Sequence, residues 1–378
     1  MNKKLLTVAI AAALAAPVAM ADVQITGTAN VSFNYLTADD TVFQPLDGTA
    51  YIGDGNSNIV FKGSEDLGNG LKAIWQITTF VDFDDGGDTW ANGNTFVGLA
   101  SDWGTVLLGR HDTPYKMSTG RLDLFANTFA DYNNVMGRSY DPFTLDGSTF
   151  NNFDLRPDNV IAYVSPDFNG FSGVAAYVVD ENNNGSLVLD PIKDASAWSI
   201  AGTYANGPIF VTAAYEQHDS FYGITNGVAA VSFDEDAWKL GGAYTFGNFQ
   251  FGAMWETISS DVPGIPGFEP ISHDNWMLNG SYTMGNNVFK VQYLNAGEFD
   301  GDGLLGITSG AEMWALGIDH NFSKRTKVYA LYAQMNNDGG DFTGLTGYGL
   351  GTGVNFDVNP TQGGGSVDGF GVGIQHKF

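Results

Sequence analysis

The chain has 378 residues, a formal net charge of −26 and no cysteine, and 50 of its residues are glycine. The acidic balance argues against a nucleic-acid-binding protein, because that class needs a basic footprint. Without cysteine the fold cannot rest on disulfides. Aromatic residues make up 13% of the chain and recur along it, so we expect an ordered protein rather than a disordered one.

Residues 1–21 have the organisation of a secretory signal peptide. Lys3 and Lys4 form a basic start, residues 5–16 are apolar, and residues 19–21 read Ala-Met-Ala. We therefore expect cleavage before Asp22 and one mature domain over residues 22–378. After Ala21 no apolar run approaches the ~20 residues that a spanning helix needs.

Strict alternation is the main structural signal. Over residues 23–35 the odd positions are apolar or small, and the even positions are Gln, Thr, Asn and Ser. This period of two predicts a strand with one apolar and one polar face. The pattern returns over residues 249–257 and 276–284. Its polar face is mostly uncharged, which is typical of a water-filled lumen rather than of the outside of a soluble sandwich.

Short turns alternate with long loops. The turns lie at residues 65–70, 102–104, 166–171, 205–208, 247–248, 285–287 and 323–326, and the loops at 37–57, 82–94, 111–158, 180–196, 218–237, 259–274, 297–310 and 336–366. Seven turns and eight loops connect sixteen strands. An even strand number, with the short turns on the periplasmic side, is the outer-membrane arrangement. We predict an all-β, transmembrane antiparallel barrel of about 16 strands, with 14 and 18 as the alternatives.

The C-terminal segment also alternates and ends on an aromatic residue, Phe378. The plain interpretation is a last strand that simply stops. A strand ending in this way also resembles the one that outer-membrane barrels present to the barrel assembly machinery, and we assign Phe378 as that assembly signal.

Several stretches resemble the Gram-negative general-diffusion porins of the trimeric, neisserial type. They are DVQITGTANV at 22–31, IVFKGSEDLGNGLKAIWQ at 59–76, FVGL at 96–99, GTVLLGRHDTPY at 104–115, NVIAYVSPDFNGFSG at 159–173, FSKRTKVY at 322–329 and GFGVGIQHKF at 369–378. The resemblance implies a homotrimer of sixteen-stranded barrels in which the long third loop folds into the lumen as a constriction. Partners would be outer-membrane lipids, lipopolysaccharide, small hydrophilic solutes and ions, and no nucleic acid.

The third loop, 111–158, is the longest in the chain, and loops of this length usually have a function. The resemblance implies opposed charges across the constriction, which tune ion preference. Our candidates are Arg110 as the wall cation, Lys62 as a second basic wall residue, and His111, Asp112, Arg121, Asp123, Asp131 and Arg138 on or beside the loop. The alternative for Arg110 is an arginine that snorkels at a strand end.

Two wall positions depart from the family pattern. Relatives carry basic residues where this chain has Asn58 and the stretch 92–94, Asn-Gly-Asn. With these cations missing and 42 acidic residues in the chain, we expect a preference for cations.

No cofactor is expected. Acidic loop segments such as 82–88, 234–236 and 298–302 are most simply a solvated rim. The alternative is bound Ca²⁺ or Mg²⁺, since both cations prefer carboxylate oxygens. The DGDG at 300–303 resembles the start of an EF-hand loop, but if Glu298 is position one, Ser309 stands at position twelve, where the loop requires Glu.

The sequence thus predicts an exported outer-membrane porin for passive diffusion of ions and small hydrophilic solutes. A porin selective for one nutrient class is the alternative, followed by a non-channel barrel that acts as an adhesin or a hydrolase. We expect no enzyme, because neither H-E-x-x-H nor G-x-S-x-G occurs.

Overall fold

The computed structural model describes residues 22–39, 46–87, 89–139, 153–179, 196–225, 230–261, 270–300, 310–338, 348–351 and 365–378. The predicted signal peptide lies outside these residues. None of the helices in the described segments is long and apolar enough to cross a membrane.

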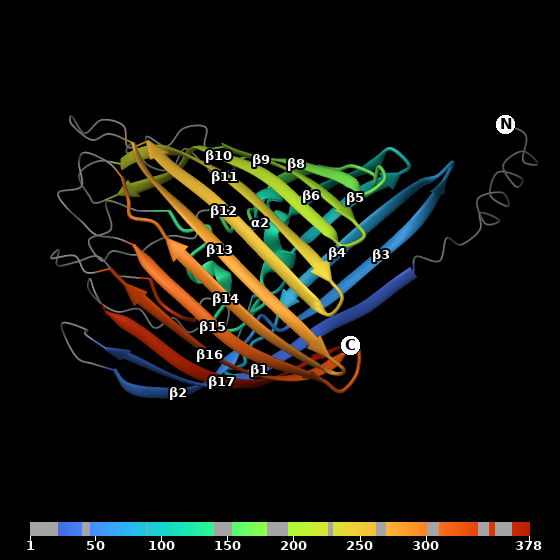
Figure 1. The fold of residues 1–378 in the computed structure, drawn as a ribbon. Helices are drawn as coiled ribbons and strands as arrows, with labels where there is room; N and C mark the ends of the chain where they lie inside the picture. The colour runs from blue at the N-terminus through green and yellow to red at the C-terminus, as the bar shows by residue number, and fades with distance from the viewer. Residues whose placement is uncertain are drawn as a thin grey trace, which may run out of the picture.

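The described strands form one antiparallel sheet that closes on itself, because β1 pairs with β17 on one edge and with β2 and β3 on the other (Figure 1). The strands are β1 (Asp22–Asp39), β2 (Leu46–Asp54), β3 (Asn58–Gly68), β4 (Leu71–Phe80), β5 (Thr95–Ser101), β6 (Gly104–Arg110), β7 (Val160–Val164), β8 (Phe171–Val179), β9 (Ser196–Asn206), β10 (Ile209–Thr225), β11 (Ala230–Phe246), β12 (Phe249–Asp261), β13 (Ile271–Met284), β14 (Asn287–Ala296), β15 (Ala311–Asn321), β16 (Thr326–Asn337) and β17 (Ser366–Lys377).

β2 and β3 together occupy one strand position beside β1. β2 pairs with the second half of β1, from Val31 onward, and β3 pairs with its first half, up to Thr28. A short break at residues 55–57 separates them, and its backbone stays bonded to β1 through the Gly55 N–H, which donates to the Asn30 carbonyl at 2.8 Å. The barrel therefore has sixteen strands around its circumference, as the turn count predicted.

Alternation separates the two faces as predicted. In β1, Ile25 is exposed on the outer face while Asn30 and Asn34 are buried inside. Aromatic side chains make a belt near the extracellular strand ends, in which Tyr215 contacts both Trp198 and Trp238 at ring-centroid distances of 4.9 and 4.5 Å. Further members of the belt are Trp255, Trp276, Tyr293, Trp314, Tyr332, Phe370 and Tyr35. Such belts mark membrane–water interfaces.

Three predicted loop boundaries were wrong in the same direction. The segment 37–57 contains β2, and β10 and β11 extend to Thr225 and from Ala230 into the predicted loop 218–237. Likewise β12 reaches Asp261 and β13 begins at Ile271. The paired backbone continues beyond the apolar band, since hairpin hydrogen bonds remain favourable in water once the strands are aligned.

The wall is low on one side. β5 and β6 have 7 residues each and β7 has 5, whereas β10 and β11 have 17 each. The outer face of these short strands is mainly aliphatic, with Val97, Leu108 and Ile161 exposed, and an aromatic pair, Trp103 and Tyr163, lies at its periplasmic end. We call β5 to β7 the low wall and the opposite side, around β10 and β11, the tall wall. The aromatic belt runs over the tall wall, so the two sides of the barrel present different surfaces.

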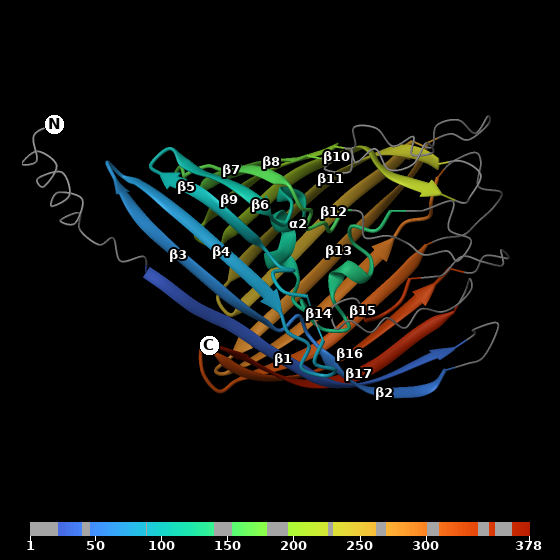
Figure 2. The ribbon, with the colours of Figure 1, turned by 180° about the vertical axis from the view of Figure 1, so that it is seen from behind.

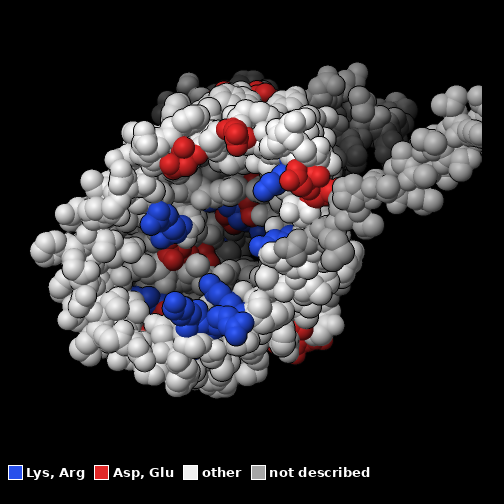
Figure 3. Space-filling view, turned by 90° about the vertical axis from the view of Figure 1, so that its right-hand side faces the viewer, with Lys and Arg blue, Asp and Glu red and all other residues white. Residues whose placement is uncertain are grey.

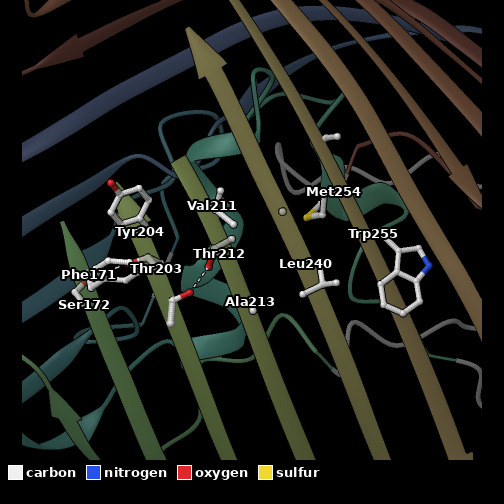
Figure 4. Close-up of a pocket in the computed structure, with 13 residues that line it drawn as sticks. Phe171, Ser172, Thr203, Tyr204, Val211, Thr212, Ala213, Leu240, Met254 and Trp255 are labelled. Carbon is white, nitrogen blue, oxygen red and sulfur yellow. Dashed lines mark hydrogen bonds between the residues drawn. The ribbon is translucent and has the colours of Figure 1, made fainter. Parts of the chain in front are cut away.

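A hollow of about 610 Å³ lies on the outside of the tall wall, across β8 to β12 (Figure 4). Exposed Val211, Leu240 and Trp255 border it, and the small residues Gly202 and Ala253 leave the space. Because its exposed rim belongs to the apolar outer face, this hollow is no part of a path through the lumen.

The first and last strands meet at a glycine, Gly27. Gly27 and Phe378 exchange two backbone hydrogen bonds of 3.0 Å, and the Phe378 ring lies where a side chain at Gly27 would stand. A Cβ there would be 2.5 Å from the Phe378 ring and 2.4 Å from the Asn58 carbonyl oxygen. The C-terminal aromatic therefore packs across the seam between the first and last strands.

Gly27→Leu should weaken this seam by about 1–3 kcal/mol, because the added atoms force Phe378 or β3 to move. The free energy of unfolding from urea titration in detergent or vesicles measures it. Gly202→Leu is the matched control, since a Cβ there meets no atom within 4 Å. Equal stability of the two variants would contradict the packing described for Gly27.

Candidate functional site

The third loop lies inside the barrel (Figure 2). It leaves β6, forms α2 (Pro114–Thr119), η1 (Gly120–Leu122) and η2 (Tyr132–Asn134), and returns to β7. α2 contacts β8, β9 and β10, and η1 contacts β11 and β12. The loop then reaches β1, where the Asn30 side-chain amide donates to the Asn127 carbonyl at 2.9 Å. Its helical part thus follows the wall formed by β8 to β12, while its two ends meet β4 and β5, where the Arg156 guanidinium lies over the Phe80 ring and the His111 ring contacts Phe96.

An apolar patch on the lumen wall holds the loop. The wall side contributes fully buried side chains from β13 to β16, namely Met277, Leu294, Met313 and Met335. The loop side contributes Leu122, Phe125, Phe129, Val135 and Met136, all fully buried as well. Burying a side chain of this size stabilises by roughly 1.5–3 kcal/mol. The predicted inward fold of the third loop is what this patch produces.

Glu256 on β12 is the polar anchor of the loop. Its Oε2 accepts from the Tyr115 hydroxyl of α2 at 2.9 Å, and its Oε1 accepts from the Gly137 N–H at 2.8 Å. The carboxylate is fully buried and lies 3.3 Å from the Lys239 ammonium, which sits 4.0 Å from the centre of the Tyr115 ring. One side chain therefore fixes both the outgoing and the returning part of the loop to the wall.

A second polar contact lies beside the anchor. His218 of β10 stacks on Phe153 of the returning loop, with ring centroids 4.5 Å apart and planes 11° apart. Its Nε2 is 2.9 Å from Glu216 Oε1, and Glu235 Oε1 accepts from the Ser260 hydroxyl at 2.8 Å. The wall under the loop thus holds the buried ionisable side chains of Glu216, His218 and Glu235 close together.

The two ends of the loop are joined to each other, and we call residues 110–116 with 153–158 the neck. The His111 N–H donates to the Pro157 carbonyl at 3.3 Å and the Thr113 N–H to the Leu155 carbonyl at 3.2 Å. Ion pairs cross the neck between Arg110 and Asp158 at 2.7 Å, Asp112 and Arg156 at 2.9 Å, and Lys116 and Asp154 at 3.1 Å. The neck fixes where the loop enters and leaves the wall.

The neck also supplies cations near the wall stretch 92–94, Asn-Gly-Asn. Asn94 donates from its amide to Asp112 at 2.8 Å and accepts from the Arg156 guanidinium at 3.1 Å. Burial raises the pKa of Asp112, but the charges of Lys116 and Arg156 outweigh it and hold that pKa below its ordinary 3.8. Lys116 and Arg156 thus stand beside Asn94, next to Gly93, where the family resemblance indicates a missing cation.

Asp123 and Asp131, two predicted site residues, bind backbone N–H groups within the third loop. Asp123 accepts the Phe125 and Tyr132 N–H groups, and Asp131 accepts the Asn127 and Asn133 N–H groups. Burial raises the pKa of Asp131 to about 6, and burial with the Asp131 charge raises the pKa of Asp123 well above 3.8. Both carboxyls therefore shape turns within the loop.

The other predicted site residues are spread over the lumen. Arg121 is exposed on η1, with its guanidinium carbon 4.3 Å from the centre of the Phe210 ring, and Lys62 is exposed on β3. Arg138 is buried and donates to the Asn133 carbonyl at 3.1 Å.

The two predicted residues at the start of the neck also make local contacts. His111 Nδ1 lies 2.8 Å from the Asp112 carbonyl, and its ring is 5.4 Å from that of Phe96. Arg110 donates to the Asn92 carbonyl at 3.1 Å as well as to Asp158. Whether the predicted set as a whole lines the constriction stays a prediction.

Sequence reasoning did not select Lys116, Asp154, Arg156 and Glu256 as site residues. A signal for the docking wall was present, because Met254 and Met277 occupy polar-face positions of their strands. Apolar residues on a lumen face indicate that something covers them. No such pattern marks Glu256, since a carboxylate on a lumen face is ordinary.

No group of three or more His, Asp and Glu side chains in the described segments is arranged to hold a metal ion. The EF-hand-like stretch at 300–303 lies outside the described residues apart from Asp300. Ca²⁺ or Mg²⁺ at the acidic loops therefore stays a proposal.

Glu256→Ala should release the third loop, because it leaves the Lys239 charge and the Gly137 N–H buried without their acceptor. Removing one partner of a buried pair costs about 3–5 kcal/mol. We expect a lower free energy of unfolding and noisier single-channel current. Glu312→Ala, at an exposed position of β15, is the control, and identical current noise in both variants would refute the anchoring role.

Comparisons with known proteins agree with this architecture. The family model described as Gram-negative porin matches residues 7–340. The chain is 28% identical to outer membrane porin protein 32 of Delftia acidovorans over 388 aligned residues, with all of both chains covered. It is 28% identical to the major outer membrane protein P.IB of Neisseria gonorrhoeae, covering 64% of this chain and 63% of that protein.

Among solved structures, the anion-selective porin from Comamonas acidovorans superposes with a TM-score of 0.74 at 25% identity, covering 95% of this chain and all of that one. The trimer form of OmpT from Vibrio cholerae has the same fold, with a TM-score of 0.66 at 18% identity, covering 95% and 99%. Family, barrel and inserted loop agree: the chain belongs to the Gram-negative porins, channels of the outer membrane rather than enzymes.

Proposed function

We propose that the chain forms a water-filled channel through which ions and small hydrophilic solutes diffuse passively. The observation that carries this is the third loop, whose helical part is fixed to the tall wall, so that it narrows the lumen while the lumen face of β3 around Lys62 stays exposed. That open face carries polar side chains such as Lys62 and Gln76. A porin specific for one nutrient class is the alternative, but no described cluster singles out one solute.

We propose further that this channel prefers cations. The support is the excess of 42 acidic over 16 basic residues, together with Asn58 and Gly93 at wall positions that carry cations in relatives. Against it stand Lys116 and Arg156 at the neck and the anion preference named for the Comamonas porin. The net acidity of the chain, not the family, is therefore the basis of the proposal.

Conductance and reversal potential test both proposals. Reconstituted protein should conduct stepwise in a planar bilayer, and a potassium chloride gradient should give a reversal potential of the sign expected for potassium permeation. Arg156→Gln should increase the cation preference, and Arg156→Lys serves as the charge-preserving control. Absence of steps would overturn the channel proposal; chloride preference in both gradient directions would overturn the cation proposal alone.

We also propose a homotrimer whose subunits meet at the low wall. The aliphatic outer face of β5 to β7 lacks the aromatic belt, and an interface there would cover strands too short to present both membrane interfaces to lipid. Lipids and lipopolysaccharide would then contact the tall wall, and the assembly machinery would bind the strand that ends at Phe378.

Leu108→Glu should disrupt the trimer, because a charge at the centre of this apolar face cannot be buried without a partner. Migration of unheated samples in gels and native mass spectrometry give the oligomeric state. Lys72→Glu, at an exposed periplasmic position, is the control for added acidity. A monomer before mutation, or an intact Leu108→Glu trimer, would overturn this interface.

A further inference from the structure

The periplasmic half of the lumen carries a basic arc. It consists of lysines on β3, β4, β14, β16 and β17, which follow one another around the sheet with only β15 and β1 between them: Lys62, Lys72, Lys290, Lys327 and Lys377. Figure 3 views this end of the barrel, where Lys and Arg side chains border and line the opening, and Asp and Glu side chains lie on its outer rim and also within the opening.

Strand register places the arc on the inner face. Lys62 lies opposite Gln24 and Gln76, whereas the adjacent Ile25 belongs to the exposed apolar face. Lys377 has the same parity as Gln375, while Ile374 is exposed outside. Lys62 and Lys377 therefore face the water of the vestibule, whereas Lys290 lies under the third loop, where its ammonium donates to the Leu124 carbonyl at 2.9 Å.

Acids offset this arc only in part. Asp319 lies between two of its lysines, 2.8 Å from Lys290 and 2.9 Å from Lys327, so this trio keeps one positive charge. Asp66 lies opposite Lys72 at the periplasmic turn. Lys62 and Lys377 add to the remaining positive charge.

The extracellular end has the opposite sign. Exposed acids there include Asp84, Asp85, Glu298, Asp300 and Asp338, at or beyond the last residues of their strands. The basic residues of the neck are paired with acids: Arg110 with Asp158, Lys116 with Asp154 and Arg156 with Asp112. The pore thus joins an acidic outer vestibule to a basic inner one across the loop-narrowed middle.

We infer that this charge arrangement makes the channel a rectifier, whose conductance and ion preference depend on direction. The inference rests on the proposed channel function and adds a property to it. An acidic vestibule concentrates cations and a basic one concentrates anions. A voltage that is positive on the extracellular side drives both ions into the middle of the pore, so they accumulate and the current is large. The opposite voltage draws both out and depletes the pore.

Ion preference follows the same logic. Concentrated salt screens the vestibule that it bathes, so the vestibule on the dilute side sets the preference. With dilute salt outside, the acidic vestibule selects cations. With dilute salt on the periplasmic side, the basic arc should reduce or invert that preference.

The test is the current at equal and opposite voltages. Wild-type channels should show a current ratio of about 1.5 or more in ~0.1 M salt, falling toward 1 in ~1 M salt as the Debye length shrinks from ~10 Å to ~3 Å. The triple variant Lys62→Gln, Lys72→Gln, Lys377→Gln should lose most of the rectification. The corresponding Lys→Arg triple, which keeps the charge, should retain it.

Orientation is read from a single cysteine, which the cysteine-free chain makes unambiguous. Lys324→Cys lies in the exposed periplasmic turn, and a maleimide on a polymer too large for the pore reduces the current only from that side. Symmetric currents in dilute salt, or rectification unchanged in the Gln triple, would overturn the inference while leaving the channel proposal intact. Absence of any conductance would overturn the channel proposal itself.

Discussion

Backbone hydrogen bonding inside a bilayer is the constraint on which this structure depends. Hydrocarbon offers no partner to an N–H or C=O group, so a sheet that spans it must close. β1 carries this closure, because it pairs with β17 along one edge and with β2 and β3 along the other. Gly27 permits the last residue, Phe378, to lie across the seam. Without a continuous β1, the barrel would expose an unpaired edge to lipid.

Closure also produces the interior that the third loop fills. A ring of sixteen strands leaves a lumen too wide for side chains alone, so a narrow pore needs an inserted segment. The loop is held by two kinds of contact with different consequences. The apolar patch around Met277 and Phe125 supplies most of the burial, while Glu256 sets the position of α2 relative to the returning limb. The neck then fixes the two ends of the loop where they leave and rejoin the wall.

Much of the fold follows from the sequence because period-two alternation and glycine-bearing turns report local geometry directly. The turns at 247–248 and 285–287 lie where predicted. The ends of β10 and β11 were missed because extracellular pairing continues beyond the apolar band, where alternation no longer marks a boundary. The neck and the anchor were not found either. Asp112 meets Arg156, and Tyr115 meets Glu256, across 44 and 141 residues, and single-sequence patterns carry no information on such contacts.

The hydrogen bond between the Phe153 N–H and the Gly137 carbonyl, 3.0 Å long, has a consequence for variation. It joins the chain on either side of residues 140–152, beside the contact of Gly137 with Glu256. That segment therefore begins and ends at nearly the same point of the loop. Because the residues that flank it are held to each other and to Glu256, a change in the length of this segment should leave the part of the loop that narrows the pore in place.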